Sequence, residues 1–326
     1  MNYRALVCHA LADDLSGLRL DTLPSHSPGP DQVLVRVRAA ALNYPDLLMT
    51  QGRYQFQPEL PFVPGLEAAG EVLELGNGVH TLRVGDAVLV HARTGAIAER
   101  MLVDAAQTRP MPPGMDFAQA AGFQAASLTA YVALVRGAQL LAGETLLVHG
   151  ASGGVGMAAV QLGRHLGARV IATGTSDEKL AVVREQGAHE TVNLRDGFRD
   201  RVKALTDGRG ADVVFDPVGG TVFDESLRCI AWGGRLLVVG FASGRFPSAP
   251  ANLVLIKGIA VIGVRAGEYG RRDPVRGAEN LREINRLARE GVFRPYVCER
   301  LPLDRAIDAF RMLADRKVLG KVVIEP

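Results

Sequence analysis

The sequence predicts an α/β protein that combines a doubly wound parallel sheet with a second, β-rich part. Between residues 145 and 264, six short apolar runs alternate with helical segments, as in a parallel sheet with crossover helices. The runs at 213–215 and 236–239 are continuously apolar, which is typical of strands covered on both faces. Residues 1–124 instead carry short strand patterns separated by prolines and glycines, which favours a compact, irregular β-barrel.

The β-rich part begins with a candidate strand at 3–8. Apolar and polar residues alternate at 33–39 and 70–76, which predicts half-buried strands, and a turn followed by a strand is predicted at 84–90. Residues 41–70 are rich in aromatic residues and proline. A rigid loop of this kind either lines a site or only covers the barrel, and the residue pattern favours neither reading.

A helical pattern at 116–136 leads into the alternating region. Helices are predicted near 177–186, 198–206 and 223–231. The predicted strands are 145–149, 169–173, 190–194, 211–216, 234–239 and 259–264. After residue 265 we expect amphipathic helices near 276–290 and 303–316, then a last strand at 321–325, and this tail is expected to return to the first part.

The stretch 146–156, Leu-Leu-Val-His-Gly-Ala-Ser-Gly-Gly-Val-Gly, places a glycine-rich turn between a strand and a helix. The first N–H groups of a helix lack intrahelical partners and carry partial positive charge, so a phosphate binds there if no Cβ blocks it. Gly153 and Gly154 leave that space, and Gly156 allows close packing. The alternative is a glycine-rich connector, but the following helix and strand complete a βαβ unit and predict a dinucleotide site.

Composition narrows the class of protein further. The net charge of +2 gives no electrostatic case for nucleic acid or a membrane surface as partner. The three cysteines lie far apart, which favours a reducing compartment and excludes a local cysteine metal knuckle. The first residues form too short an apolar run for a signal peptide, and no window approaches the roughly 18 apolar residues of a membrane span. We therefore expect a cytoplasmic protein.

The end of the second predicted strand indicates which nicotinamide cofactor is bound. NAD-binding folds place a carboxylate about 20 residues past the glycine turn, whereas this chain has Gly174 there. Thr175 and Ser176 offer hydroxyl donors, and Lys179 offers positive charge for a 2′-phosphate. The pattern favours NADP(H), although Lys179 is also compatible with a solvated helix lysine.

Taken together, the motifs resemble the medium-chain dehydrogenase/reductase superfamily, and within it the zinc-free quinone oxidoreductases related to zeta-crystallin. The resemblance covers essentially the whole chain. It implies a GroES-like catalytic domain at 1–124 and 266–326 and a Rossmann dinucleotide-binding domain at 125–265. The motifs that carry it are Asn43-Tyr44-Pro45-Asp46, Gly52-Arg53-Tyr54, Leu60–Gly70, Gly85–Val88, Ser127–Tyr131, Ala151–Gly156 and Asp216–Gly219.

The chain departs from the zinc alcohol dehydrogenases at the positions of their metal ligands. Those enzymes carry a cysteine where this chain has Asn43, and Gly-His-Glu where it has Gly65-Leu66-Glu67. Leucine cannot bind zinc and a neutral amide binds it poorly, so we expect no metal. We interpret Glu67 as structural, and neither it nor Asp46 has a neighbouring carboxylate in the sequence.

The expected reaction is hydride transfer from NADPH to a quinone or another conjugated carbonyl, whose own π-system spreads the incoming charge. We expect Asn43 to donate a hydrogen bond to the developing oxyanion. Tyr54 is expected to donate a hydrogen bond or a proton, and Asp46 to orient Asn43 or a water. His149, inside the glycine turn, is interpreted as a packed or hydrogen-bonded histidine rather than a base.

Cofactor contacts are expected at the glycine turn and at the carboxyl ends of the strands. By resemblance Thr129 is expected to meet the nicotinamide, and Arg316 or Lys321 is expected to reach the cofactor phosphates. For Arg316 and Lys321 a surface role is equally compatible with the sequence. The expected cofactor-binding residues are Thr129, Ser152, Gly153, Gly154, Val155, Gly174, Thr175, Ser176, Lys179, Val218, Gly240, Phe241, Val264, Arg265, Arg316 and Lys321.

Two other functions remain open at this point. One is an NADPH-dependent enoyl- or acryloyl-thioester reductase, for which Arg53, Arg265, Arg271 and Arg272 would form a basic channel. The other is an NADPH-binding regulatory or nucleic-acid-binding protein, which the near-neutral charge disfavours. The apolar run 253–264 would lie at the edge of the parallel sheet, so we also expect a homodimer through that edge.

Overall fold

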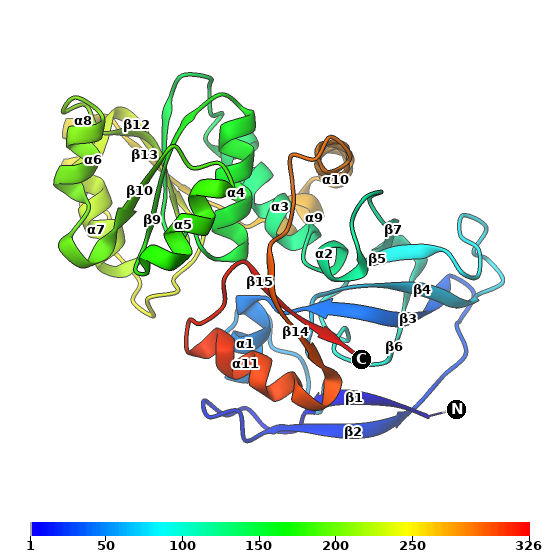
Figure 1. Cartoon of the computed structure of the whole chain (residues 1–326). Coiled ribbons are helices and arrows are strands. Elements are labelled where there is room, and N and C mark those ends of the chain that lie inside the picture. The colour runs from blue at the N-terminus through cyan, green and yellow to red at the C-terminus, as the bar shows by residue number, and fades with distance from the viewer. Residues whose placement is uncertain (1) are drawn as a thin grey trace. The chain divides into compact units, whose positions relative to one another are not determined.

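The computed structural model describes residues 2–326, and of Asp196 only the backbone. Contacts between residues divide the chain into two compact units (Figure 1). The first consists of Met1–Ala125 with Pro295–Pro326, and the second of Ala126–Arg294. Among the described residues, no helix is long and apolar enough to cross a membrane.

The second unit is built around a six-stranded parallel sheet with the order β10-β9-β8-β11-β12-β13. The order reverses between β8 and β11, which makes the carboxyl ends of these two strands the place where open sheets of this kind bind ligands. The predicted doubly wound sheet is confirmed. Its strands are β8 (Thr145–Val148), β9 (Arg169–Gly174), β10 (Glu190–Asn193), β11 (Ala211–Asp216), β12 (Ile230–Val238) and β13 (Ala260–Gly263).

Helices cover both faces of this sheet. Figure 1 shows α4 and α5 on one face and α6 and α7 on the other. Leu147, Val214 and Leu236 are completely buried between these layers, which explains why their strands read as continuous apolar runs. The helices are α4 (Gly154–His165), α5 (Asp177–Glu185), α6 (Arg199–Leu205), α7 (Gly220–Cys229) and α8 (Ala251–Lys257), with a short 3-10 turn at Leu194–Asp196.

The helical region predicted at 116–136 is divided into three pieces. These are α2 (Phe117–Ala121), α3 (Gln124–Tyr131) and a π-helical segment, η2 (Val132–Gly137), and the boundary between the two units falls within α3. Helices α9 (Ala266–Arg272) and α10 (Pro274–Arg289) follow the sheet.

Contacts place residues 266–294 in the second unit, whereas the sequence-based division grouped them with the first. Side-chain bonds explain the difference. Arg136 donates from Nε to Asn280 Oδ1 at 2.9 Å and forms an ion pair with Glu279 at 3.1 Å, which ties α10 to η2. The amphipathic pattern of α10 predicted a helix but did not indicate which unit it packs on.

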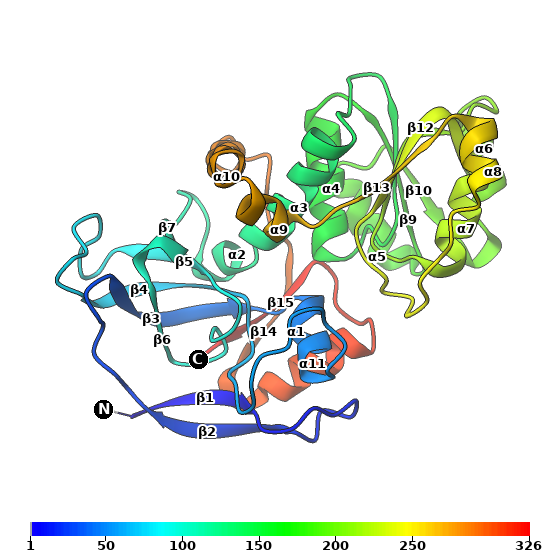
Figure 2. The same ribbon diagram turned by 180° about the vertical axis from the view of Figure 1, so that it is seen from behind.

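The first unit holds a two-stranded sheet, β1 (Asn2–Cys8) with β2 (Leu18–Pro24), and a larger seven-stranded sheet. The larger sheet has the order β14-β15-β3-β4-β5-β7, with β6 also paired to β3. Figure 2 shows the last strand lying beside β3, so residues 295–326, the last part of the predicted tail, return to this unit. The strands are β3 (Gln32–Ala41), β4 (Glu67–Leu75), β5 (Ala87–His91), β6 (Arg100–Asp104), β7 (Thr108–Pro110), β14 (Val297–Pro302) and β15 (Lys321–Glu325).

In addition to α2, this unit contains the helices α1 (Tyr44–Thr50) and α11 (Ala306–Ala314), with 3-10 turns at Ala105–Gln107 and Leu303–Arg305. Their apolar sides join one core with the sheet, in which Met49 and Phe310 are completely buried. Strands β2, β6, β7 and β14 were absent from the prediction because they are short and mix charged and apolar residues.

Candidate functional site

The glycine turn opens the helix α4 at the switch point of the parallel sheet. Gly153 is the N-cap of α4, and a Cβ added there meets only the Gly150 carbonyl oxygen, at 3.5 Å. A Cβ at Gly156 would collide with the backbone of Gly150 and Ala151. Residues 152–155 remain partly accessible. The turn therefore presents the first N–H groups of α4 to an unobstructed space, which fits a cofactor phosphate.

The other strands of the sheet bring their carboxyl ends to the same edge. Asp216, at the end of β11, accepts hydrogen bonds at Oδ1 from the N–H groups of Val218 (2.8 Å) and Gly219 (2.9 Å). The loop after β12 packs on this turn, because a Cβ on Gly219 would lie 3.1 Å from the ring of Phe241. The structure thus brings the predicted residues Val218, Gly240 and Phe241 together.

Three further predicted cofactor residues lie in the second unit. Val264 is buried and donates its N–H to the carbonyl of Val238 at 2.9 Å, beside the end of β12. Arg265 follows it as the exposed N-cap of α9, and Thr129 is half-buried in α3.

The predicted 2′-phosphate region lies where β9 ends and α5 begins. Gly174 ends β9, Thr175 is exposed and Lys179 is half-buried in the first turn of α5. The Ser176 hydroxyl accepts from the Lys179 N–H at 3.3 Å and donates to Glu178 Oε2 at 2.5 Å. Because its only hydrogen is committed to Glu178, Ser176 donates nothing to a phosphate in this arrangement, which corrects the expected role of its side chain.

A buried polar cluster lies in the first unit where three elements begin. Helix α1 starts after Asn43, β4 starts at Glu67 and β15 starts at Lys321, and strand pairing of β3 with β4 and β15 brings them together. The Lys321 ammonium donates to Asn43 Oδ1 at 2.8 Å and to Glu67 Oε1 at 2.9 Å. Glu67 Oε2 accepts from the backbone N–H of Ala125 at 2.9 Å, so both oxygens of this carboxylate bind groups of the protein itself.

Two predictions for this cluster are wrong. Lys321 was expected to reach cofactor phosphates, but its side chain is 5% exposed and its ammonium faces Asn43 and Glu67. Asn43 was expected to donate to an oxyanion, but its amide donates to Glu67 Oε1 at 3.0 Å and weakly to the Ala41 carbonyl at 3.4 Å. The cluster holds both amide hydrogens inside the protein.

Asp46 is fully buried beside this cluster. Its Oδ2 accepts the backbone N–H of Asn43 at 2.8 Å, so it orients the backbone at the start of α1 rather than the amide of Asn43. Burial raises the pKa of Asp46 to about 7, against the opposing effects of the Asn43 N–H and Lys321, and the charge of Glu67 adds to the rise. Asp46 and Glu67 therefore interact electrostatically although they are distant in the sequence.

Three further residues of this unit, Tyr54 and Arg316 from the predicted site and Tyr44 from the family motif, lie outside the cluster. Tyr54, in the loop after α1, is half-buried and packs against the core. Phe56 lies in the same loop, and the guanidinium of Arg93, from the loop after β5, lies 4.6 Å from the centre of its ring. Tyr44, at the start of α1, is 37% exposed. Arg316 is exposed in the turn after α11, with a positive φ of 57°.

Comparison with known proteins assigns the family. The chain is 39% identical to the quinone oxidoreductase-like protein 2 homolog of Nematostella vectensis, over 99% of this chain and 89% of that protein. This chain belongs to the quinone oxidoreductase-like branch of the medium-chain dehydrogenase/reductase family. It is accordingly an oxidoreductase, as the motifs of the glycine turn and of residues 43–70 implied.

Solved structures of this family share the fold. A quinone oxidoreductase of Pseudomonas syringae pv. tomato superimposes with a TM-score of 0.89 at 30% identity, covering 100% of both chains. A mycobacterial protein complexed with NADPH superimposes with a TM-score of 0.91 at 30% identity, covering 99% of this chain and 100% of that one.

Two family models match the chain. The alcohol dehydrogenase GroES-like domain matches residues 29–136, and the zinc-binding dehydrogenase model matches residues 154–281. Among the described residues, no group of three or more His, Cys, Asp or Glu could hold a metal ion.

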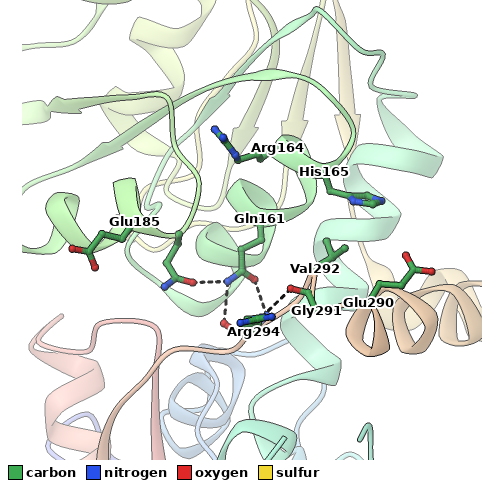
Figure 3. A pocket seen from close by; sticks show the side chains of 9 residues that line it. Gln161, Arg164, His165, Glu185, Glu290, Gly291, Val292 and Arg294 are labelled. Atoms are coloured by element: carbon green, nitrogen blue, oxygen red, sulfur yellow. Dashed lines mark hydrogen bonds between the residues drawn. The ribbon is translucent and has the colours of Figure 1, made fainter. Parts of the chain in front are cut away.

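A separate polar pocket of about 420 Å³ lies in the second unit, near the C-terminal end of α4 (Figure 3). The side chain of Gln161 lines this pocket and makes three hydrogen bonds there. Its amide donates to Gln186 Oε1 at 2.7 Å and to the Arg294 carbonyl at 2.9 Å, and its Oε1 accepts the Arg294 N–H at 3.3 Å. Gln161 thus holds the backbone at the residue where the second unit ends.

The main feature that sequence reasoning missed is the pairing of Lys321 with Glu67. The sequence carried one signal for this pair. Lys321 is the first residue of a strand that is otherwise largely apolar, Lys321–Glu325, and a lysine beside buried residues needs a partner of opposite charge. The interpretation of His149 as a packed, hydrogen-bonded residue is confirmed, since it is completely buried and both ring nitrogens have partners.

Proposed function

We propose that this chain is an NADPH-dependent oxidoreductase that reduces a quinone or another conjugated carbonyl without zinc. The observation that carries the proposal is the ammonium of Lys321, which lies between Asn43 and Glu67. In the zinc enzymes of the superfamily, the positions of Asn43 and Leu66 carry metal ligands, and here the chain supplies its own cation beside them. No Lewis acid is then available to polarise a simple ketone or to hold an alkoxide.

The cofactor proposal has separate support from the second unit. The open space at Gly153 and the free N-terminus of α4 suit a pyrophosphate, and no carboxylate occupies position 174. We propose Ser152–Val155 as backbone donors to the pyrophosphate, with Thr175 and Lys179 toward a 2′-phosphate. When bound, NADPH supplies the hydride. Its complex with a relative at 30% identity supports the same cofactor here.

The chain's own residues bind and orient the acceptor. A conjugated acceptor spreads the incoming charge, so hydrogen bonds from a few fixed donors are enough. With the Asn43 amide committed to the cluster, the phenols of Tyr44 and Tyr54 are the proposed donors, since both rings retain access to solvent. Asp46 and the Asn43–Glu67–Lys321 cluster keep the start of α1 in place beneath them.

The test is steady-state NADPH oxidation with a small water-soluble quinone, before and after exhaustive chelation with verified metal content. We expect turnover that is unchanged within experimental error by chelation, because no described side chains form a zinc site. The control is a zinc alcohol dehydrogenase treated in parallel, which must lose activity. Loss of quinone reduction that added zinc restores would contradict the proposal.

We also propose a homodimer through the edge strand β13. This edge and the neighbouring surface expose large apolar side chains, with Trp232 and Leu255 each 82% exposed, Ile256 70% and Val261 37% exposed. An apolar sheet edge left unpaired promotes association with other chains.

The absence of disulfides among the three described cysteines fits the proposed cytoplasmic location.

In sedimentation velocity at micromolar concentration, the wild-type protein is expected to sediment as a dimer. Val261→Lys places a charge on the edge strand and should produce monomers. Val84→Lys, at a position 66% exposed in the first unit, is the matched control and should remain dimeric. A monomeric wild-type protein would rule out this interface.

A further inference from the structure

His149 lies at the centre of a buried hydrogen-bonded chain in the second unit. It follows β8 directly and its N–H donates to the carbonyl of Phe215 at 3.0 Å. Its Nδ1 lies 2.8 Å from the Thr173 hydroxyl and its Nε2 lies 2.7 Å from the Ser226 hydroxyl. The ring of Phe198 packs edge-on against the imidazole at 4.8 Å. No part of His149 reaches solvent, so it is not a general base for the substrate.

The hydrogen bonds of Ser226 determine the tautomer of this imidazole. Ser226 donates its only hydrogen to the Val222 carbonyl at 2.7 Å, one turn earlier in α7. The same oxygen must therefore accept from His149, which places the ring hydrogen on Nε2. Nδ1 is then bare and accepts the hydrogen of the Thr173 hydroxyl. Burial keeps the ring neutral, which is consistent with one donor and one acceptor.

Thr173 connects the two parts of the proposed cofactor site. Its carbonyl accepts the N–H of Ala151, in the glycine turn, at 3.1 Å, and its hydroxyl is held by His149. The next residue is Gly174, the end of β9, where the proposed 2′-phosphate region begins. The spacing between the turn and the end of β9 therefore depends on Thr173 and on the imidazole that holds its side chain.

We propose that His149 is a positioning residue that sets the preference for NADPH over NADH, by holding Thr173 and with it the distance between the glycine turn and the end of β9. This inference rests on the proposed function for its ligand. NADPH must place its pyrophosphate and its 2′-phosphate at both locations at once, whereas NADH makes no phosphate contact at the second. Because the Ser176 hydroxyl is committed to Glu178, the backbone position at the end of β9 matters more than that hydroxyl.

The experiment is equilibrium binding of NADPH and NADH, measured by the change in nicotinamide fluorescence, with 2′,5′-ADP as a competitor. Thr173→Val removes the hydroxyl that His149 holds and keeps the β-branched shape. We expect its Kd for NADPH to rise about tenfold, the usual effect of losing one well-placed hydrogen bond, while the Kd for NADH changes less than threefold. Thr173→Ser keeps the hydroxyl and should retain the wild-type ratio of the two Kd values.

Ser226→Ala is the matched control, because it removes the partner on the other side of the same imidazole. It should lower Tm as much as Thr173→Val does and leave the ratio within twofold of wild type. Two further variants keep the test decisive if Thr173→Val fails to fold. His149→Asn places an amide oxygen near the Nδ1 position and should retain the ratio, whereas His149→Gln places its amide near Nε2 and should lose it.

Three results are distinguishable. A rise in the ratio of the Kd for NADPH to the Kd for NADH in Thr173→Val and His149→Gln alone supports the inference. Equal ratios in all variants, or an equal rise in Ser226→Ala, would overturn it while leaving the proposed cofactor intact. A wild-type protein that binds neither nucleotide would overturn the proposed function and this inference with it.

Discussion

Replacing Lys321 by methionine is expected to lower the free energy of unfolding by about 3–5 kcal/mol, the usual effect of removing one partner of a buried ion pair. The side chains of Lys321 and Glu67 are 5% and 2% exposed, so the Glu67 carboxylate would remain without a counter-charge and without solvent. The Asn43 amide would lose the donor to its oxygen. Equilibrium denaturation in urea measures the effect.

The control is Lys317→Met, which removes an exposed ion pair with Asp315 at 2.9 Å and is expected to cost less than about 1 kcal/mol. A second replacement, Glu67→Gln in the Lys321→Met background, removes the unpaired charge and should restore part of the loss. NADPH affinity of Lys321→Met should stay within threefold of wild type. A variant of normal stability that has lost NADPH affinity would show instead that Lys321 contacts the cofactor.

The second large effect is a loss of stability in acid caused by His149. Burial lowers the pKa of this imidazole to about 3, from 6.5 in an exposed histidine. Below pH 6.5 the unfolded chain therefore binds a proton that the folded chain does not, and stability falls as the pH falls from 6.5 to 3. The full effect is at most about 5 kcal/mol, because each pKa unit corresponds to about 1.4 kcal/mol.

His149→Gln isolates this contribution, because glutamine does not titrate. The difference in unfolding free energy between wild type and His149→Gln should shrink steadily between pH 6.5 and pH 4. Asp46 acts in the opposite sense: its pKa is raised to about 7, so its contribution falls as the pH rises from 3.8 through 7. The pH dependence of the wild-type unfolding free energy contains the contributions of both His149 and Asp46, so the comparison with His149→Gln is needed. If the difference in unfolding free energy between the two proteins does not change with pH, the assignment to His149 is contradicted.

The fold of the second unit was predictable because local pattern and tertiary environment agree there. In Ala211–Asp216 the central run, residues 213–215, is continuously apolar because both faces of the strand are covered, and the glycines of the turn are required by close approach at Gly156. The first unit was less predictable. Short strands such as Leu18–Pro24 alternate charged and apolar residues on an exposed surface, and the length of the pattern is too small to distinguish them from loops.

The site shows the same limit in chemical terms. The glycine turn is contained in one stretch of sequence, so its role could be predicted from that stretch alone. The cluster of Asn43, Glu67 and Lys321 joins residues 24, 254 and 278 positions apart, and no local spacing indicates such contacts. Ser176 was misread for the opposite reason, since a serine before a helix is both a phosphate donor and an N-cap, and here the cap is formed.

The measurement that tests the central proposal most directly is NADPH consumption by the purified protein, with a small quinone and a short enoyl thioester in parallel and NADH alongside. We expect fast loss of NADPH with the quinone, slower loss of NADH, and little reaction with the thioester. Fast turnover with the thioester alone would assign this chain to the enoyl reductases. Tight NADPH binding without turnover on either acceptor would contradict the proposed reaction, while the proposed cofactor site would still be supported.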